Sequence, residues 1–200
     1  QRQMCIRDSY CAMLLAEVFD KAGVPSGVFN VVNGYGPTVG AALSEHPDVA
    51  MMSFTGSTRA GIAVAQASAS SVKRVHQELG GKSSNIILDD VVDLEKSVKG
   101  GAGHCFLNSG QSCNAPTKML ISSKNYDKAV EIAVATANST TVGDPNGEFR
   151  LGPIANKVQY EKILKLIEIG IEEGATLVAG GVEKPDGCDK GYYLSLIHIP

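Results

Sequence analysis

The sequence predicts an α/β protein whose short strands form a parallel sheet. Short runs rich in β-branched and aromatic residues alternate with longer segments in which apolar residues recur at helical spacing. An alternating order of strands and helices favours right-handed crossovers, which make neighbouring strands parallel. A hydrophobic content of 44% and 22 glycines in 200 residues are typical of a globular protein of this class.

The first part of the chain alternates between helices and strands. Residues 10–22 carry an apolar helical face, and Gly23 followed by Pro25 ends that helix. A turn at 33–37 precedes Thr38, which is placed to cap the next helix. Helices are expected at 10–22, 38–43 and 60–69, and strands at 28–32, 49–54 and 73–77.

The second part repeats the alternation after a domain seam expected near Gly80 and Gly81. Asn125 or Ser123 is placed to cap a helix that runs to residue 138. Strands are expected at 85–88, 118–121 and 175–179, helices at 94–106, 125–138 and 156–173, and a polar loop at 141–153. Cys113 then falls in the loop that follows the helix at 94–106.

Composition excludes several classes of function. A net charge of -3 leaves no basic footprint for nucleic acid, and no apolar run is long enough for a membrane-spanning helix. No signal peptide is visible. The five cysteines are odd in number and irregularly spaced, which suggests neither a disulfide framework nor a metal site. A reducing cytoplasm is the expected location.

Both ends of the chain are interpreted as foreign. Residues 1–8 and 194–199 can be back-translated into DNA strings of which the second is the reverse complement of the later part of the first, in a shifted frame. Natural protein ends have no reason for this relation, which is typical of a translated transposon-end sequencing tag. Residues 1–9 and 194–200 are therefore left out of the fold prediction, and the remainder is expected to be an internal piece of a longer protein.

Two groups of residues suggest a nucleotide site. Gly56, Ser57 and Gly61 follow an expected strand and open a helix, where free N–H groups and positive potential suit a phosphate. An ordinary capped turn explains the same residues. Gly36 and Pro37 lie in an earlier glycine-rich turn that suits the adenine end of a cofactor or a plain tight turn.

Glu78 and Cys113 are the candidates for chemistry. Glu78 lies at a strand end beside Gly80, where a carboxylate can act as a base; a solvated glutamate is the simpler interpretation. Cys113 ends the polar stretch Asn-Ser-Gly-Gln-Ser-Cys, which is not a core context, although a lone cysteine is commonly structural. The four histidines lack ligand spacing, and His76 is interpreted as structural or as a surface residue.

Taken together, these stretches resemble the aldehyde dehydrogenase superfamily. The resemblance is carried in order by Phe-Thr-Gly-Ser-Thr-Arg-Ala-Gly at 54–61, Glu-Leu-Gly-Gly-Lys-Ser at 78–83 and Asn-Ser-Gly-Gln-Ser-Cys at 108–113. It implies a Rossmann-like parallel sheet that forms the C-terminal part of an NAD(P)-binding domain at 10–81. The N-terminal part of an α/β catalytic domain would follow at 82–193.

The resemblance also implies a reaction. Cys113 matches the nucleophile that attacks an aldehyde and carries the thioacyl group, and Glu78 matches the base that activates water for its release. The N–H of Cys113 would form half of the oxyanion site. Gly56, Ser57 and Gly61 match the pyrophosphate turn of an NAD or NADP site, and Leu79 matches a residue whose backbone faces the nicotinamide. The full-length protein is expected to be a homodimer or homotetramer.

Parts of the family pattern are absent from these 200 residues. They include the asparagine that supplies the second oxyanion donor and the segments that contact the two riboses of the cofactor. The chain alone is therefore expected to be inactive. The alternatives are a CoA-acylating dehydrogenase, a non-catalytic nucleotide-binding or structural relative, and a cysteine hydrolase. Glu78 favours water over CoA, and no histidine is placed to activate the thiol of a hydrolase.

Overall fold

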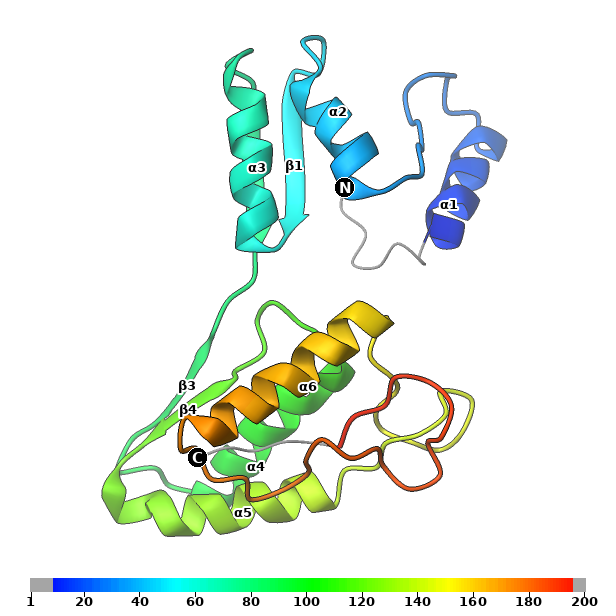
Figure 1. The fold of residues 1–200 in the computed structure, drawn as a ribbon. Coiled ribbons are helices and arrows are strands. Elements are labelled where there is room, and N and C mark those ends of the chain that lie inside the picture. Colours follow the sequence, from blue (N-terminus) through cyan, green and yellow to red (C-terminus); the bar gives the residue numbers. More distant parts are fainter. Residues whose placement is uncertain (1–8, 196–200) are drawn as a thin grey trace. The chain divides into compact units, whose positions relative to one another are not determined.

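The computed structural model describes residues 9–195, and the chain divides into two compact units between Gly80 and Gly81 (Figure 1). Each unit is described by itself. The two terminal segments interpreted as tags lie outside the described residues except at positions 9, 194 and 195. Among the helices described, none combines the length and the apolar character that crossing a membrane requires.

The first unit contains a two-stranded parallel sheet with helices beside it. Its elements are α1 (Ser9–Lys21), the π-helical turn η2 (Gly36–Gly40), α2 (Ala41–Glu45), β1 (Met51–Gly56), α3 (Thr58–Ala69) and β2 (Arg74–Leu79). Strand β1 pairs with β2 in a register that places Thr55 opposite Glu78 and Gly56 opposite Leu79. Helix α3 connects the two strands and packs against both, as the crossover prediction requires.

The second unit contains a second parallel pair of strands and three longer helices. Its elements are β3 (Ser84–Ile87), α4 (Leu94–Phe106), η3 (Leu107–Gly110), β4 (Lys118–Ile121), η4 (Ser123–Asn125), α5 (Tyr126–Asn138) and α6 (Lys157–Glu172). Side chains cap two of the helices: Asp93 accepts from the N–H of Lys96 at 2.9 Å, and Asn156 accepts from the N–H of Gln159 at 3.0 Å. The α/β class with parallel strands is thus confirmed.

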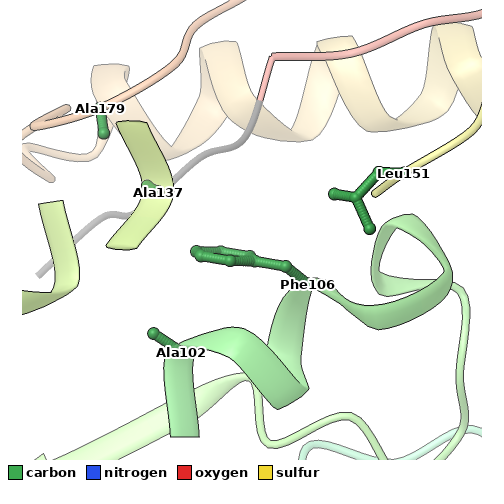
Figure 2. Close-up of a cluster of buried hydrophobic side chains, with 5 residues drawn as sticks. All are labelled: Ala102, Phe106, Ala137, Leu151 and Ala179. Atoms are coloured by element: carbon green, nitrogen blue, oxygen red, sulfur yellow. The ribbon is translucent and has the colours of Figure 1, made fainter. Parts of the chain in front are cut away.

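Two clusters of buried hydrophobic side chains form the core of the second unit. In the first, the ring of Phe106 lies between Ala102 and Ala137, with Leu151 and Ala179 around it (Figure 2). The second cluster joins β3, α4 and α5 through Ile87, Val98, Ala129 and Ala133. Alanines at these contacts let α4 and α5 approach closely. Among the described residues, all the buried hydrophobic side chains belong to this unit.

Replacement of Phe106 by alanine is expected to destabilise the second unit by about 3–5 kcal/mol, because it leaves a cavity at the centre of the first cluster. Phe106 is 6% exposed, whereas Phe149 is 51% exposed and serves as a matched control of the same size. Urea denaturation of both variants measures the difference. An equal loss of stability in Phe149→Ala and Phe106→Ala would contradict the assignment of this core.

Two of the expected strands do not form. Residues 28–32 are irregular, and the segment at 175–179 contains only an isolated bridge residue at Ala179. A β-rich run becomes a strand only when its backbone N–H and C=O groups find a neighbouring strand. Within residues 9–195 the strands pair only as β1 with β2 and β3 with β4. Thr38 is also not a cap, because it lies inside η2, whose N-cap is Tyr35.

Candidate active site

Cys113 lies just after a strained turn in the second unit. Helix α4 ends at Phe106, and the next residues form η3, in which Asn108 and Ser109 adopt φ values of 53° and 55°. Gly110 continues the left-handed backbone with φ 71°. Left-handed conformations cost non-glycine residues on the order of 1 kcal/mol or more, so the surrounding structure must hold this turn in place.

Hydrogen bonds from the turn to residues 152–155 provide that support. The hydroxyl of Ser109 donates to the carbonyl of Gly152 at 2.7 Å. The side-chain oxygen of Gln111 accepts from the N–H of Ala155 at 2.9 Å, and its amide nitrogen lies 3.5 Å from the carbonyl of Pro153. The same nitrogen donates to the carbonyl of Asn108 at 3.0 Å. Gln111 therefore connects the turn to a segment more than forty residues away in sequence.

The thiol loop is open on one side and closely packed on the other. Cys113 is exposed, so a small molecule can reach its sulfur. A Cβ atom added to Gly81 would lie 3.2 Å from the carbonyl oxygen of Cys113, which is closer than such contacts normally occur. Glycine at position 81 thus permits the approach of the two backbone segments. Among the described residues, the N–H of Cys113 donates to no backbone acceptor, which leaves it free for an oxyanion.

The other described cysteines differ from Cys113. Cys105 lies on α4 against the first core cluster, and burial raises the pKa of its thiol, an effect that the charge of Lys82 partly offsets. Cys188 is buried, with its sulfur 3.9 Å from the carbonyl of Val142. Cys11 is exposed on α1. Because the thiolate is the nucleophilic form, the raised pKa makes Cys105 a poorer nucleophile than an unperturbed cysteine at neutral pH.

Replacement of Gln111 by alanine is expected to loosen the thiol loop, because it removes three hydrogen bonds and leaves the left-handed turn without its main support. The expected loss in the free energy of local opening is about 2 kcal/mol. Hydrogen exchange of peptides that cover residues 107–114 measures it. Gln159→Ala on the exposed side of α6 is the matched control. Unchanged exchange in Gln111→Ala would show that the turn is held by other contacts.

Glu78 is the penultimate residue of β2 in the first unit, where its side chain is 63% exposed. The strand was expected to end at residue 77, before Glu78. It continues to Leu79, because β2 pairs with β1 as far as Gly56 and Leu79. Strand periodicity places His76 on the same face as Glu78. The Nε2 atom of His76 lies 3.6 Å from a carboxylate oxygen of Glu78, and the side chain of His76 is 57% exposed, which agrees with its interpretation as a surface residue.

The glycine turn at the start of α3 joins the end of β1 to a capped helix. Ser57 is the N-cap of α3, and its hydroxyl accepts from the N–H of Ala60 at 3.3 Å. Gly61 is buried against β2: an added Cβ would lie 2.7 Å from a methyl carbon of Leu79. The amide nitrogen of Gln77 donates to the carbonyl of Gly61 at 2.6 Å. Gly56, the last residue of β1, leads directly into this helix start.

The remaining candidate residues are less closely tied to this turn. Gly36 and Pro37 begin η2 and are exposed. Gly80 is exposed and would accept a Cβ without contact. Gly56, Ser57, Gly61, Glu78 and Leu79 are thus gathered at one end of the sheet in the first unit, and Cys113 belongs to the second. No group of three or more potential metal ligands occurs in the part of the chain that the structure describes.

Sequence reasoning missed two sets of contacts near the candidate residues. His76 could have been found from the two-residue period of the strand, which puts residues 76 and 78 on one face. The contacts of Ser109 and Gln111 with residues 152–155 could not have been found from the sequence, because they join segments far apart in the chain. No local pattern signals a contact of that kind.

Comparison with known proteins identifies the family of this chain. The aldehyde dehydrogenase family model matches residues 6–197. A 3-succinoylsemialdehyde-pyridine dehydrogenase from a Pseudomonas species is 52% identical over 185 residues, which are 92% of this chain and 39% of that protein. A crystal structure of an aldehyde dehydrogenase from Bartonella henselae has a TM-score of 0.91 and 50% identity, over 94% of this chain and 39% of that one.

A third relative was crystallised with ligands. Aldehyde dehydrogenase C of Pseudomonas syringae, in a cysteine-to-alanine form complexed with NAD+ and octanal, has a TM-score of 0.91 and 46% identity over 94% of this chain and 39% of that one. The chain therefore belongs to the aldehyde dehydrogenase family, a family of oxidoreductases, and has its Rossmann-like α/β fold. It spans 39% of the length of these relatives.

Proposed function

We propose that this chain supplies the thiol, the base and part of the cofactor site of an enzyme that oxidises an aldehyde to a carboxylic acid with NAD or NADP. The observation that carries the proposal is the exposed thiol of Cys113 at the end of a left-handed turn held by hydrogen bonds. A strained and well-supported turn beside a reactive side chain is typical of an active site. Membership in the aldehyde dehydrogenase family supports the same reaction.

The proposed reaction uses two side chains in sequence. The thiolate of Cys113 adds to the aldehyde carbonyl, and the N–H of Cys113 donates to the resulting oxyanion. NAD or NADP, when bound, supplies the acceptor for the hydride that leaves this carbon. The acyl group then remains on Cys113 as a thioester. Glu78 removes a proton from water, the hydroxide attacks the thioester carbonyl, and the thiolate of Cys113 leaves with formation of the carboxylic acid.

The start of α3 fits the phosphates of such a cofactor. Gly61 fills a position where a Cβ would collide with Leu79, so glycine there lets the first turn of the helix approach β2. The hydroxyl of Ser57 already accepts a hydrogen bond from the N–H of Ala60. The N–H groups of Thr58 and Arg59 come earlier in the helix and point out of its start. We assign Gly56, Ser57 and Gly61 to the pyrophosphate, Leu79 and Gly80 to the nicotinamide side, and Gly36 and Pro37 to the adenine side.

Other properties of the enzyme belong to the same proposal. The intact protein is a cytoplasmic homodimer or homotetramer. The cysteines support a reducing location, because Cys11, Cys105, Cys113 and Cys188 are all free. The relatives suggest two kinds of aldehyde to test: octanal, with which the Pseudomonas syringae protein was crystallised, and the pyridine semialdehyde that names the Pseudomonas relative.

Reduction of NAD and NADP by the full-length enzyme, with these aldehydes and with or without CoA, tests the proposal. We expect aldehyde-dependent NADH or NADPH formation and a free carboxylic acid as the product in both cases. An acyl-CoA product formed only with CoA present would favour the CoA-acylating alternative. Absence of oxidation with every aldehyde would favour a non-catalytic relative. The 200-residue chain alone is expected to be inactive. Aldehyde oxidation by this chain alone would show that the rest of the enzyme is not needed for the reaction.

A further inference from the structure

We propose that Gln111 is a positioning residue that fixes the backbone before Cys113, so that the N–H of Cys113 points at the oxyanion formed on the aldehyde. This role rests on the proposed function and deepens it, because it requires Cys113 to be the nucleophile. All the contacts that support it are made inside the second unit, in a fold that the chain shares with its longer relatives.

Both polar atoms of the Gln111 side chain have partners. Its Oε1 atom accepts from the N–H of Ala155 at 2.9 Å. Its Nε2 atom donates to the carbonyl of Asn108 at 3.0 Å and lies 3.5 Å from the carbonyl of Pro153. Turning the amide over would place its oxygen against two carbonyls and its nitrogen against an N–H, so one orientation is strongly preferred. The side chain therefore ties the left-handed turn to residues 152–155 in a single arrangement.

The segment that Gln111 binds is itself anchored in the core. Leu151 and Ile154 are each 3% exposed, and Leu151 belongs to the first core cluster. The N–H of Leu151 donates to the carbonyl of Thr141 at 3.0 Å, and the N–H of Ile154 donates to the carbonyl of Tyr192 at 2.9 Å. Burial and hydrogen bonding at both residues leave the segment little freedom to follow the thiol loop. Gln111 is thus fastened to a rigid part of the unit.

Cys113 lies between this fixed point and a second one. On its far side Ala115 is 2% exposed, and the N–H of Ala115 donates to the carbonyl of Ser112 at 3.2 Å. The carbonyl of Cys113 packs against Gly81, where an added Cβ would lie 3.2 Å from the carbonyl oxygen. The N–H of Cys113 belongs to the rigid peptide plane that joins Ser112 to Cys113. Gln111 holds the chain just before this plane, and Ala115 and Gly81 hold it just after.

The direction of that N–H matters when negative charge develops on the substrate oxygen. A donor stabilises the oxyanion only if it lies about 2.7–3.1 Å from the position that this oxygen will occupy. Misplacement of a reacting group by about 1 Å can cost about 10²-fold in rate. Binding of NAD or NADP and simple alkylation of the thiol form no oxyanion. Loss of Gln111 should therefore slow the addition to the aldehyde and spare these two processes.

Gln111→Met in the full-length enzyme tests this role, because methionine has a similar length but cannot make the three contacts. The first equivalent of NADH or NADPH should form about 10²-fold more slowly in a single turnover. Alkylation of Cys113 by iodoacetamide, in which an S–C bond forms and iodide leaves, should stay within about threefold of the wild-type rate. The Kd of the cofactor, measured by calorimetry, should not change, which also reports that the variant is folded.

Three further variants make the result specific. Gln159→Met, the same substitution on α6, is the matched control and should behave as wild type. Gln111→Glu keeps the acceptor for the N–H of Ala155 but cannot donate when ionised, so it should show the same pattern with a smaller loss; it replaces the methionine variant if that one does not fold. Ser109→Ala removes the bond to Gly152 and keeps the contacts of Gln111, so the first equivalent should slow only about fivefold.

Three outcomes would overturn the proposal. The first is a wild-type rate for the first equivalent in Gln111→Met. The second is an equal slowing of alkylation, which would mean that the thiol rather than the N–H donor is displaced. The third is an equal loss in Ser109→Ala, which would assign the support to the turn as a whole. Wild-type activity in Cys113→Ser would instead show that the nucleophile is wrongly assigned, which is a failure of the proposed function itself.

Discussion

Replacement of Cys113 by serine in the full-length enzyme is expected to lower aldehyde oxidation by on the order of 10⁴-fold or more. A serine hydroxyl is a much weaker nucleophile than a thiolate. The backbone and the hydrogen bonds of Gln111 and Ser109 would be preserved, since neither involves the sulfur. The loss would therefore report on chemistry rather than on folding.

NADH formation under saturating aldehyde measures the effect, with two cysteine variants as controls. Cys11→Ser changes an exposed thiol on α1 and should retain wild-type activity. Cys105→Ser changes a half-buried thiol whose pKa burial raises, and should also remain active. Activity of Cys113→Ser within tenfold of wild type would contradict the covalent mechanism. Loss of activity in Cys105→Ser alone would show that Cys105 on α4 is the nucleophile.

Replacement of Glu78 by glutamine is expected to separate the two halves of the reaction. The first equivalent of NADH should form normally, and steady-state turnover should fall by about 10²–10⁴-fold, because the thioester is no longer attacked by an activated water. The acyl group should then remain on Cys113, where mass spectrometry of the intact protein detects it. Glutamine preserves the size of the side chain at an exposed strand position, so stability should not change.

Two controls make this result specific. Glu17→Gln alters an exposed carboxylate on α1 and should have no effect. Hydroxylamine, a nucleophile that needs no base, should release the acyl group from Glu78→Gln and restore turnover. If the first equivalent of NADH is lost together with turnover, Glu78 acts before the thioester forms, and its assignment as the deacylation base is wrong.

The parts of the fold that depend on local signals were predictable. The helix at Leu94–Phe106 and the strand at Lys118–Ile121 have the expected bounds, because apolar periodicity and capping residues mark them in the sequence. The run at 28–32 has the composition of a strand but lacks a described partner strand, which composition does not reveal. Strand β2 extends to Leu79 because its neighbour β1 continues pairing there.

The residues of the candidate site come from sequence motifs, whereas their supports come from the fold. Glu78, Cys113 and the turn at Gly56 stand out as polar or small residues after strands and helices, where ligands bind in α/β proteins. The contact of His76 with Glu78 required the correct alignment of a short strand. The bonds of Gln111 to residues 152–155 required the tertiary fold. Motifs thus select the candidate residues, and the folded chain shows which contacts hold them.

The left-handed turn before Cys113 implies a trade-off between thermal stability and turnover. Glycine at position 108 or 109 would remove the cost of φ values near 53° and 55°, so a screen for heat resistance would favour it. The same change would free the backbone beside the thiol and, at position 109, delete the hydroxyl that reaches Gly152. Variants selected for heat resistance at these two positions should therefore be slower enzymes.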